Sequence, residues 1–448
     1  MLQNNLRSVL AHHITGRTAV EIAASVEAAL RAGALGSGAK LPTVRELATR
    51  LRVSPTTVAS AYRTLRLRGL VVAQGRRGSA ISHHPPIALA RAAARVPEHA
   101  VDLASGNPDP ALLPELGPAL RGIDASPVLY GEDLCDPELM RLARRALGVD
   151  GIPADSLTVV SGALDGIERA LGAWLRPGDR VGVEDPGFPA VFHLVSALGL
   201  VPVPIVVDDA GPLPEATERA LRSGIEALVV TTRAQNPFGS ALDEKRVRDL
   251  RGVLRAHPGV LVLEDDHGGS VAGAPAQTLC ASGGERWAVV RSVSKSLGPD
   301  LRLAFLAGDE ATIARIEGRL ALGMRWVSHL LQRTVAALLE DKGVIRSLRA
   351  ADRSYTERRR ALLAALSERG IPAFGRSGMN VWVPVSDEDS AAAALLEAGF
   401  AVSTGARFRI HSAPALRITT ATLRAEDAGG VADALALALR PARRSLSA

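Results

Sequence analysis

The sequence predicts an α/β protein in which an N-terminal winged helix-turn-helix precedes a larger domain with a mainly parallel sheet and a smaller C-terminal α/β subdomain. The chain has 448 residues, which is too long for one ordinary core. Its basic charge lies at one end: residues 1–84 hold 12 Arg or Lys against 3 Asp or Glu, a net +9, whereas the remainder carries −3. From about residue 101, short β-rich runs alternate with amphipathic stretches, which is the pattern of a parallel sheet with helices on both faces.

The composition excludes several classes of protein. Apolar residues make up 47% of the chain, enough for folded cores, and no apolar run reaches the ~18–20 residues that cross a bilayer. The start MLQNNLRSVLAHH lacks the parts of a signal peptide, so we expect a cytoplasmic protein. Cys135 and Cys280 have neither a CxxC nor a Cys/His spacing, so we expect free thiols, no disulfide and no metal site.

Residues 40–82 predict two short helices and a hairpin. Thr43 followed by Glu46 is a capping box at the start of the first helix, and Ser54 followed by Pro55 is an N-cap at the start of the second. The connection between the two helices is as tight as that of a helix-turn-helix. The runs LVVAQ and SAIS then flank GRRG, which predicts a two-stranded wing.

The surface of this module suits nucleic acid. The second helix presents Thr56, Thr57 and Arg63, and the tip of the wing presents Arg76 and Arg77, where a phosphate contact is useful. A basic helical cap without a ligand is the alternative interpretation of the same pattern.

The segment LPTVRELATRLRVSPTTVASAYRTLRLRGLV resembles the winged-helix domain of the GntR regulators over its whole length. The resemblance implies a double-stranded DNA operator as partner and contacts from Arg45 and the Thr-Thr pair. Pro55 departs from the family, since many relatives carry arginine there, and implies fewer base contacts from this helix. The candidate DNA-binding residues are Arg45, Ser54, Thr56, Thr57, Arg63, Arg76 and Arg77.

Residues 83–100, HHPPIALARAAARVPEHA, combine Pro-Pro with small residues and predict a linker. The pair His83 and His84 has no third ligand nearby and is expected to be polar linker, not a metal site. The expected domains are a DNA-binding domain over residues 1–82, the linker over 83–100, a large domain over 101–330 and a C-terminal subdomain over 331–448.

Reactive and polar side chains follow the strands of the predicted sheet, at the carboxyl ends where ligands bind in such sheets. One strand leads through Ser161, Gly162 and Ala163 into a helix, whose first N–H groups suit a phosphate. Taken singly, each residue of the set also has a structural interpretation, but their shared order along the chain is hard to obtain by chance. The later strands are followed in turn by Phe188, Asn236, Asp265, Asp266, His267, Lys295 and Arg302.

These side chains match what pyridoxal 5'-phosphate requires from a protein. Its lysine must form a Schiff base, which requires a neutral amine and therefore a lowered pKa, and a carboxylate must keep the ring nitrogen protonated. Lys295 is one of only four lysines, against 49 arginines, and follows the apolar run WAVV in a turn. The other three fit less well: Lys40 lies in the basic module, Lys245 in a charged helix, and Lys342 before Gly343.

The segment SVSKSLGPDLRLAFLAG is the most specific part of a resemblance to the fold-type I, class I aminotransferases that runs from about residue 101 to 440. The resemblance implies that Lys295 carries the cofactor and that Asp265 pairs with the pyridine nitrogen. It also implies that Asn236 bonds the ring hydroxyl and Phe188 stacks on the ring. Arg417, in APALRITTATL, matches the arginine that binds a substrate carboxylate as a bidentate fork.

The same resemblance assigns the cofactor's phosphate to two subunits. Tyr130 would reach the phosphate of the neighbouring subunit, although YGEDLCDPEL lacks the glycine and arginine common after this tyrosine. His267 stands where a tyrosine usually bonds the ring hydroxyl, and an imidazole titrates near neutrality. The choice of Asp265 over Asp266 rests on the spacing to residue 267 and stays open. The phosphate ligands implied within one subunit are Ser161, Gly162, Ala163, Ser292 and Arg302.

Together the two halves resemble the MocR/GabR subfamily of transcription regulators from end to end. The resemblance implies a homodimer that places two winged helices on paired half-sites. The expected effector is pyridoxal phosphate, as in members that control vitamin B6 genes, or an amino compound that reacts with it at Lys295. His267 favours the first choice, and Arg417 favours a ligand that bears a carboxylate.

Two other functions stay open. Every residue needed for half-transamination is present, so a working pyridoxal phosphate-dependent aminotransferase that acts on an amino acid is the main alternative. The other is a structural DNA-binding protein with an inactive enzyme fold. Such a protein would bind no cofactor and would not need Lys295 together with an aspartate and Asn236. We expect a domain used for sensing, with catalytic turnover as the open question.

Overall fold

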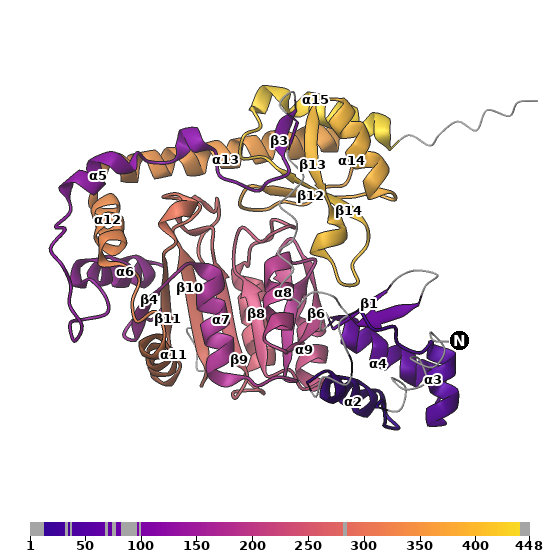
Figure 1. The fold of residues 1–448 in the computed structure, drawn as a ribbon. Coiled ribbons are helices and arrows are strands. Elements are labelled where there is room, and N and C mark those ends of the chain that lie inside the picture. Colours follow the sequence, from indigo (N-terminus) through magenta and orange to yellow (C-terminus); the bar gives the residue numbers. More distant parts are fainter. Residues whose placement is uncertain are drawn as a thin grey trace, which may run out of the picture. The chain divides into compact units, whose positions relative to one another are not determined.

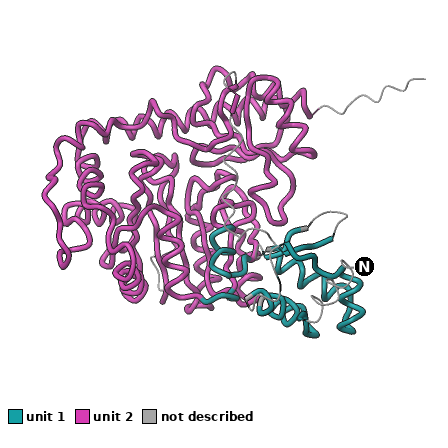
Figure 2. Tube along the Cα trace, viewed as in Figure 1, with its two compact units in different colours: residues 1–93, 176–179, 193–202 teal, residues 94–175, 180–192, 203–448 magenta. Residues whose placement is uncertain are grey.

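The computed structural model describes residues 13–31, 35, 38–67, 70–73, 78–81, 96–97, 100–280 and 285–439. The chain forms two compact units (Figure 2). One unit holds residues 1–93 with the short segments 176–179 and 193–202, and the other holds residues 94–175, 180–192 and 203–448. The division after residue 93 falls inside the expected linker 83–100, most of which lies outside the described residues.

The described part of the N-terminal unit has helices before a short hairpin (Figure 1). The predicted capping box is confirmed, because Thr43 Oγ1 accepts the Glu46 N–H at 3.2 Å and the Glu46 carboxylate accepts the Thr43 N–H at 2.8 Å. The elements are α2 (Ala19–Arg31), α3 (Val44–Leu51), α4 (Pro55–Leu67), β1 (Val71–Ala73) and β2 (Ser79–Ile81), and β1 and β2 pair antiparallel.

A single apolar cluster holds these helices together. Ile22 of α2, Leu47 of α3 and Val58 of α4 are fully buried in it. Tyr62 is also buried, and its hydroxyl donates to the Pro42 carbonyl at 2.8 Å, which ties α4 to the segment that precedes α3. The helix-turn-helix predicted from residues 40–82 is confirmed, and α2, which precedes that segment, completes its core.

Residues 157–308 contain an eight-stranded sheet in the order β4-β11-β10-β9-β8-β5-β6-β7 (Figure 1). β5, β8, β9 and β10 are parallel, whereas β11 is antiparallel to both of its neighbours. The predicted, mainly parallel sheet is therefore confirmed. Its strands are β4 (Leu157–Val160), β5 (Arg180–Asp185), β6 (Val201–Asp208), β7 (Gly211–Pro212), β8 (Ala227–Thr231), β9 (Leu261–Asp266), β10 (Trp287–Ser292) and β11 (Ala304–Gly308).

Helices connect and flank these strands. No helix of the described residues is long and apolar enough to cross a membrane. The helices are α5 (Leu116–Gly122), α6 (Pro137–Val149), α7 (Ala163–Trp174), α8 (Pro189–Ala197), α9 (Pro214–Arg222), α10 (Glu244–Leu254), α11 (Glu310–Leu322) and α12 (His329–Glu340), with single 3₁₀ turns at Pro110–Leu112, Gly269–Val271 and Pro299–Leu301.

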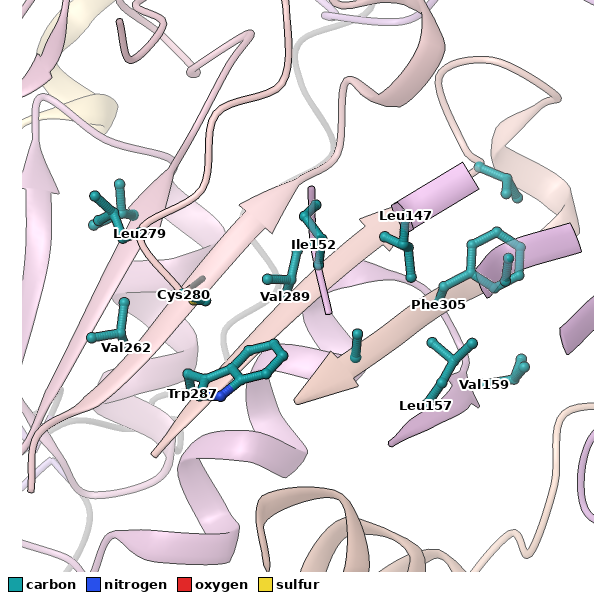
Figure 3. Packing of buried hydrophobic residues seen from close by; sticks show 14 of the residues in the cluster. Leu147, Ile152, Leu157, Val159, Val262, Leu279, Cys280, Trp287, Val289 and Phe305 are labelled. Carbon is teal, nitrogen blue, oxygen red and sulfur yellow. The ribbon is translucent and has the colours of Figure 1, made fainter. Parts of the chain in front are cut away.

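Both faces of the sheet are covered, as the alternation of Val289 and Val290 on β10 shows. Consecutive strand residues point to opposite faces. Val289 packs in one apolar cluster with Leu147 of α6 and Phe305 (Figure 3). Val290 faces α7 instead, where a Cβ added to Gly166 would lie only 3.0 Å from the Val290 Cγ1. Helix α7 therefore approaches the sheet closely because residue 166 has no side chain.

A second, four-stranded sheet lies in the C-terminal part of the chain, in the order β12-β14-β13-β3. We expected residues 101–330 to form the large domain, but residues 101–103 pair in parallel with β13 in this smaller sheet. Leu103 is buried in the core of that sheet with Val381 and Leu416, and this burial accounts for the difference. The elements are β3 (Val101–Leu103), α13 (Lys342–Glu368), β12 (Asn380–Pro384), α14 (Glu388–Glu397), β13 (Phe400–Thr404), β14 (Ala415–Thr419) and α15 (Ala428–Ala438), with 3₁₀ turns at Gly405–Phe408 and Ala425–Asp427.

The capping box provides a test of the winged-helix fold. In Thr43→Ala, the Glu46 N–H loses its acceptor, and the first turn of α3 is expected to open more easily by about 1 kcal/mol. Amide hydrogen exchange of α3 in the full chain should then be roughly fivefold faster. Thr49→Ala is the matched control, because the Thr49 hydroxyl only bonds the Arg45 carbonyl within the helix. Equal exchange in the two variants would contradict the capping role.

Candidate functional site

Lys295 lies in the turn after β10, and its side chain is partly buried. Its Nζ donates a hydrogen bond to the Gly106 carbonyl at 2.7 Å. Burial, with a further contribution from the positive charge of Arg417, lowers the pKa of Lys295 to about 8. Roughly a tenth to a fifth of this amine is therefore neutral at pH 7.0–7.4, far more than for an ordinary lysine, and a neutral amine is the form that can attack a carbonyl.

Asp265 stands next to this lysine turn, because β9 is the parallel neighbour of β10 and Asp265 pairs with Val290. The Oδ1 atom of Asp265 is buried and has no hydrogen-bond partner in the described residues. Its Oδ2 lies 3.2 Å from the Nδ1 of His267. An unpaired buried carboxylate oxygen is costly unless a ligand supplies the missing partner.

His267, expected where a tyrosine usually bonds the ring hydroxyl of the cofactor, contacts the Asp265 carboxylate in the structure; its role toward a ring hydroxyl stays a prediction. Burial alone would lower the pKa of His267, but the adjacent Asp265 carboxylate outweighs burial and raises it above the ordinary value. The imidazole therefore positions Asp265 and supports its negative charge.

The carboxylate of Asp266 is occupied by two buried arginines. Arg233 donates to it from Nε at 2.8 Å and from Nη2 at 2.9 Å, and Arg291 donates from Nε at 2.6 Å. Burial would raise the pKa of Asp266, but the two guanidinium groups hold it well below its usual range. Because neighbours on a strand point to opposite faces, Asp266 is turned away from the face on which Asp265 lies.

Ser161 and Gly162, two of the residues expected to hold a phosphate, form the turn between β4 and α7. Gly162 has φ +95°, and a Cβ added to it would lie 2.9 Å from Arg302 Nη2, so the guanidinium lies directly over this glycine. The same Nη2 donates to the Ser161 carbonyl at 3.3 Å. Glycine is required here both for the left-handed backbone and for the close approach of Arg302.

The N–H groups of this turn are partly engaged. The Ser161 N–H donates to the Asp165 carboxylate at 2.8 Å, and the Gly162 N–H donates to the Val160 carbonyl at 2.9 Å. Ala163 begins α7, where N–H groups have no partner within the helix. On the lysine turn, the Ser292 hydroxyl bonds the Ser294 hydroxyl at 3.1 Å. The groups suited to bind an anion are therefore the Arg302 guanidinium, the Ala163 N–H and the hydroxyls of Ser292 and Ser294.

Arg417 lies on β14, and it is brought next to the lysine turn from more than a hundred residues away. Its Nη2 donates to the Ala104 carbonyl and, at 3.3 Å, to the Ser403 hydroxyl, and its Nη1 donates to Asn236 Oδ1 at 3.4 Å. Burial lowers the pKa of Arg417 to about 10. The Nε of Arg417 is buried without a hydrogen-bond partner among the described residues.

Gly106, which links Arg417 to Lys295, was not foreseen from the sequence. Its carbonyl accepts from Lys295, and a Cβ on it would lie 3.2 Å from Arg417 Nη1. Gly106 has φ +73°, a backbone conformation that favours glycine. The turn-forming residues of SGNPDP were therefore the sequence signal that could have revealed this turn. The structure thus brings Lys295, through its hydrogen bond to Gly106, next to the hydrogen-bonded pair of Arg417 and Asn236.

Phe188 follows β5, and its ring is about one-third exposed, at 36%. The loop that carries it is fixed by its neighbours: Gly187 N–H donates to the Phe408 carbonyl at 2.8 Å. Asp185, also unforeseen, accepts hydrogen bonds from the N–H groups of residues 410–412 at 2.7–3.1 Å. A fixed loop with an accessible ring is suited to stacking on a flat ligand.

Tyr130 is not part of this cluster within one chain. Its side chain is 81% exposed, and its ring contacts Trp326, at 5.6 Å between centroids, and the Arg325 guanidinium at 5.0 Å. The predicted role of Tyr130 toward a neighbouring subunit therefore stays a prediction.

The candidate DNA-binding residues lie on the winged-helix unit. Arg45 of α3 and Thr56 and Arg63 of α4 are exposed. Ser54 caps α4, since its Oγ accepts the Thr57 N–H at 3.0 Å and lies 2.8 Å from the Thr57 hydroxyl. Arg76 and Arg77 lie outside the described residues.

Comparisons with known proteins match both units. The model of the aminotransferase class I and II family matches residues 98–435, and the model of the bacterial regulatory proteins of the gntR family matches residues 18–81. The vitamin B6 salvage pathway transcriptional repressor PtsJ of Salmonella typhimurium is 42% identical over 415 residues, 92% of this chain and 96% of that protein. The pyridoxine biosynthesis transcriptional regulator PdxR of Corynebacterium glutamicum is 27% identical, over 73% of this chain and 74% of its own.

Solved structures share the fold of the larger unit. The kynurenine aminotransferase of Pyrococcus horikoshii superimposes with a TM-score of 0.67 at 21% identity, over 76% of this chain and 91% of that one. The α-aminoadipate aminotransferase LysN of Thermus thermophilus gives a TM-score of 0.67 at 22% identity, over 76% of this chain and 92% of that one.

The lowered pKa of Lys295 can be measured directly. Below pH 8 the neutral fraction of this amine should rise about tenfold per pH unit, and above pH 8 it should level off. Competitive labelling with acetic anhydride over pH 6–10 reports this fraction for Lys295. In Arg417→Met, the loss of the neighbouring cation should move the curve to higher pH.

Arg248→Met, which removes an exposed arginine of α10, is the control for net charge. A Lys295 curve centred at the ordinary lysine pKa of about 10.4, or one that moves equally in both variants, would contradict this description of the site.

Proposed function

Because the chain belongs to the MocR/GabR subfamily of GntR transcription regulators, with a winged helix fused to a class I and II aminotransferase-like domain, we propose that it binds pyridoxal 5'-phosphate at Lys295 and thereby controls its affinity for DNA. The observation that carries the proposal is the juxtaposition of a lysine whose pKa is about 8 with a buried, unpaired oxygen of Asp265. We propose the cytoplasm as the place of action, because a regulator of this kind must reach DNA.

The residues of the candidate site fit the cofactor at two contacts, the one with its aldehyde and the one with its ring nitrogen. When bound, pyridoxal phosphate supplies an aldehyde that reacts with amines and a ring that withdraws electrons. Lys295 offers the neutral amine, and Asp265 offers an acceptor for a protonated ring nitrogen. Asp266 is already bonded to Arg233 and Arg291, which supports Asp265 in this role.

The remaining predicted cofactor contacts have support of unequal strength. Arg302 stands over Gly162 beside the first turn of α7, an arrangement suited to a phosphate dianion. Asn236 is held by Arg417 near Lys295, from where it would bond a ring hydroxyl. Phe188 would stack on the ring, with its loop held by the Phe408 carbonyl.

We propose pyridoxal phosphate itself as the effector. The names of two relatives, at 42% and 27% identity, connect them to vitamin B6 salvage and pyridoxine biosynthesis. In this chain, Arg417 is bonded to Ala104, Ser403 and Asn236, so a carboxylate ligand would have to exchange with existing contacts. An amino acid as effector is the alternative, which the unpaired Nε of Arg417 favours.

A homodimer is the assembly that we propose for this regulator. Large apolar side chains are exposed next to Tyr130 in the sequence and within residues 322–330, the segment whose Arg325 and Trp326 contact Tyr130, and exposed apolar surface often marks a protein interface. The exposed fractions are 65% for Leu129, 91% for Leu322, 45% for Met324 and 47% for Leu330. A second copy over this surface would bury them and place Tyr130 where it can reach the partner's cofactor.

The coupling between cofactor and DNA can be tested with one lysine and a matched control. Addition of pyridoxal phosphate should produce the absorbance of bound cofactor in the wild-type protein and in Lys245→Ala, but not in Lys295→Ala. Lys245 is exposed and, within the part of the chain that the structure describes, its side chain pairs with Asp249 on α10 alone, so it controls for the loss of a lysine. The affinity for DNA from upstream of the protein's own gene should change about 5- to 150-fold with cofactor, except in Lys295→Ala.

Other outcomes of this experiment would favour other interpretations. A DNA affinity that changes only after an amino acid is added would assign the signal to the amino compound. Turnover of amino and keto acid pairs at roughly 1–1,000 per second would favour the aminotransferase alternative. Absence of any cofactor band in the wild type would reject the proposal.

The DNA contact of α3 gives a separate test. Arg45→Ala should weaken binding to operator and to unrelated DNA alike and should lower the slope of log affinity against log salt by about 1, since one phosphate contact is lost. Arg248→Ala removes an exposed arginine of α10 in the other unit and should leave the slope unchanged. Equal slopes for all three proteins would contradict a phosphate contact at Arg45.

A further inference from the structure

A cavity of about 590 Å³ lies against the Lys295 turn, and Ser292 is the one predicted cofactor contact in its lining. Val293 and Ser296, on either side of Lys295, form part of its wall. Val149, at the end of α6, and Ile345, in the first turn of α13, form another part. The cavity therefore lies at the junction between the strand ends and the base of the long helix α13.

The lining of this cavity is strongly cationic. Arg145, Arg233, Arg291 and Arg349 line it, and Asp150 is the one acidic residue of the lining. Arg145 and Arg349 are exposed and make no ion pair within the described residues. Arg233 and Arg291 are paired with Asp150 and Asp266. The two exposed guanidinium groups of Arg145 and Arg349 therefore give this concave surface a net positive charge, which attracts anions.

The floor holds a buried guanidinium with bonding capacity to spare. Arg291 is 8% exposed, and its Nε bonds Asp266 at 2.6 Å. Its Nη2 lies 2.7 Å from the Asp150 carboxylate as an ion pair, but it has no hydrogen bond of good geometry within the described residues. Arg233 Nη2 lies 3.6 Å from the same carboxylate. The Asp150 carboxylate thus occupies the position in which the negative charge of a bound anion would interact with both Arg233 and Arg291.

The rest of the wall is apolar. Leu142, Phe305 and Leu339 line it together with Val149 and Ile345. The volume falls within the ~300–1,000 Å³ of sites for small organic ligands, which are mostly apolar with a few charged anchors. A ligand that combines an anionic head with a compact apolar body matches both parts of the lining.

We propose that this cavity is a second binding site, for a small organic phosphate whose dianion pairs with Arg291 and the mouth arginines Arg145 and Arg349. Arginine forks match the geometry of phosphate oxygens, and several of them favour a dianion over a single carboxylate. The phosphate displaces the Asp150 carboxylate, and the body of the ligand packs on Phe305 and Leu339. The site lies behind Asp266, on the other side of the strand from Asp265.

Calorimetric titration of the full chain with phenyl phosphate tests this proposal, with inorganic phosphate as the probe that lacks the apolar body. Asp150→Asn removes the internal competitor and should bind phenyl phosphate severalfold more tightly than the wild type. Asp155→Asn, an exposed acid that does not line the cavity, is the matched control for net charge. The double variant Arg145→Met/Arg349→Met should bind about tenfold more weakly and keeps the buried network intact.

Arg302→Met separates this site from the candidate cofactor site, because Arg302 does not line the cavity. Phenyl phosphate binding that survives in Arg302→Met but weakens in the double variant supports the proposal. Binding that is lost in Arg302→Met and unchanged in the double variant would place the probe at the cofactor site and overturn it. Equal affinities of Asp150→Asn and Asp155→Asn would overturn it as well. These outcomes stand whether or not pyridoxal phosphate binds at Lys295.

Discussion

The buried carboxylate of Asp266 is the constraint on which the rest of the larger unit depends. Three guanidinium nitrogens of Arg233 and Arg291 bond it at 2.6–2.9 Å, and these arginines come from two other segments of the sheet. Removing one partner from a buried ion pair typically costs about 3–5 kcal/mol, because the remaining charge is left without compensation. The network therefore fixes the carboxyl ends of β9 and β10, and Lys295 follows directly after β10.

The ion pairs of Asp266 give the adjacent carboxylates of Asp265 and Asp266 different surroundings. Asp266 neutralises buried arginines on one face of the sheet, which leaves Asp265 on the other face with an unpaired oxygen and a histidine neighbour. The same separation divides the surroundings into two cationic regions, one around Lys295 and Arg417 and one around Arg291 and Arg349. The second site that we propose depends on such a division, since each ligand shifts a protein only by its own differential affinity for two states.

Hydrogen bonds between segments that are far apart in the sequence assemble the rest of the candidate site. The carbonyl of Gly106 joins Lys295, and Arg417 joins Asn236 across 181 positions of the chain. Asp185 accepts N–H groups of residues 410–412 and so attaches the C-terminal loop to the loop that bears Phe188. The first strand of the C-terminal sheet, β3, comes from residues 101–103. The C-terminal part of the chain is thereby integrated with the segments that carry the lysine and the amide.

The sequence by itself determined many of the helices and strands, and it predicted the chemistry of the site. Strands expected at LTVV, RVGVED and WAVVRSV lie at β4, β5 and β10, and the Thr43 capping box begins α3, because period, capping and turn residues are local properties. Only the tertiary structure distinguishes the surroundings of Asp265 from those of Asp266, since Asp266 has partners more than twenty residues away, at Arg233 and Arg291. It likewise decided the contact of His267 with Asp265, the sheet to which β3 belongs, and the grouping of arginines from α6, β10 and α13 around one cavity. Contacts between distant segments depend on packing, which no local pattern encodes.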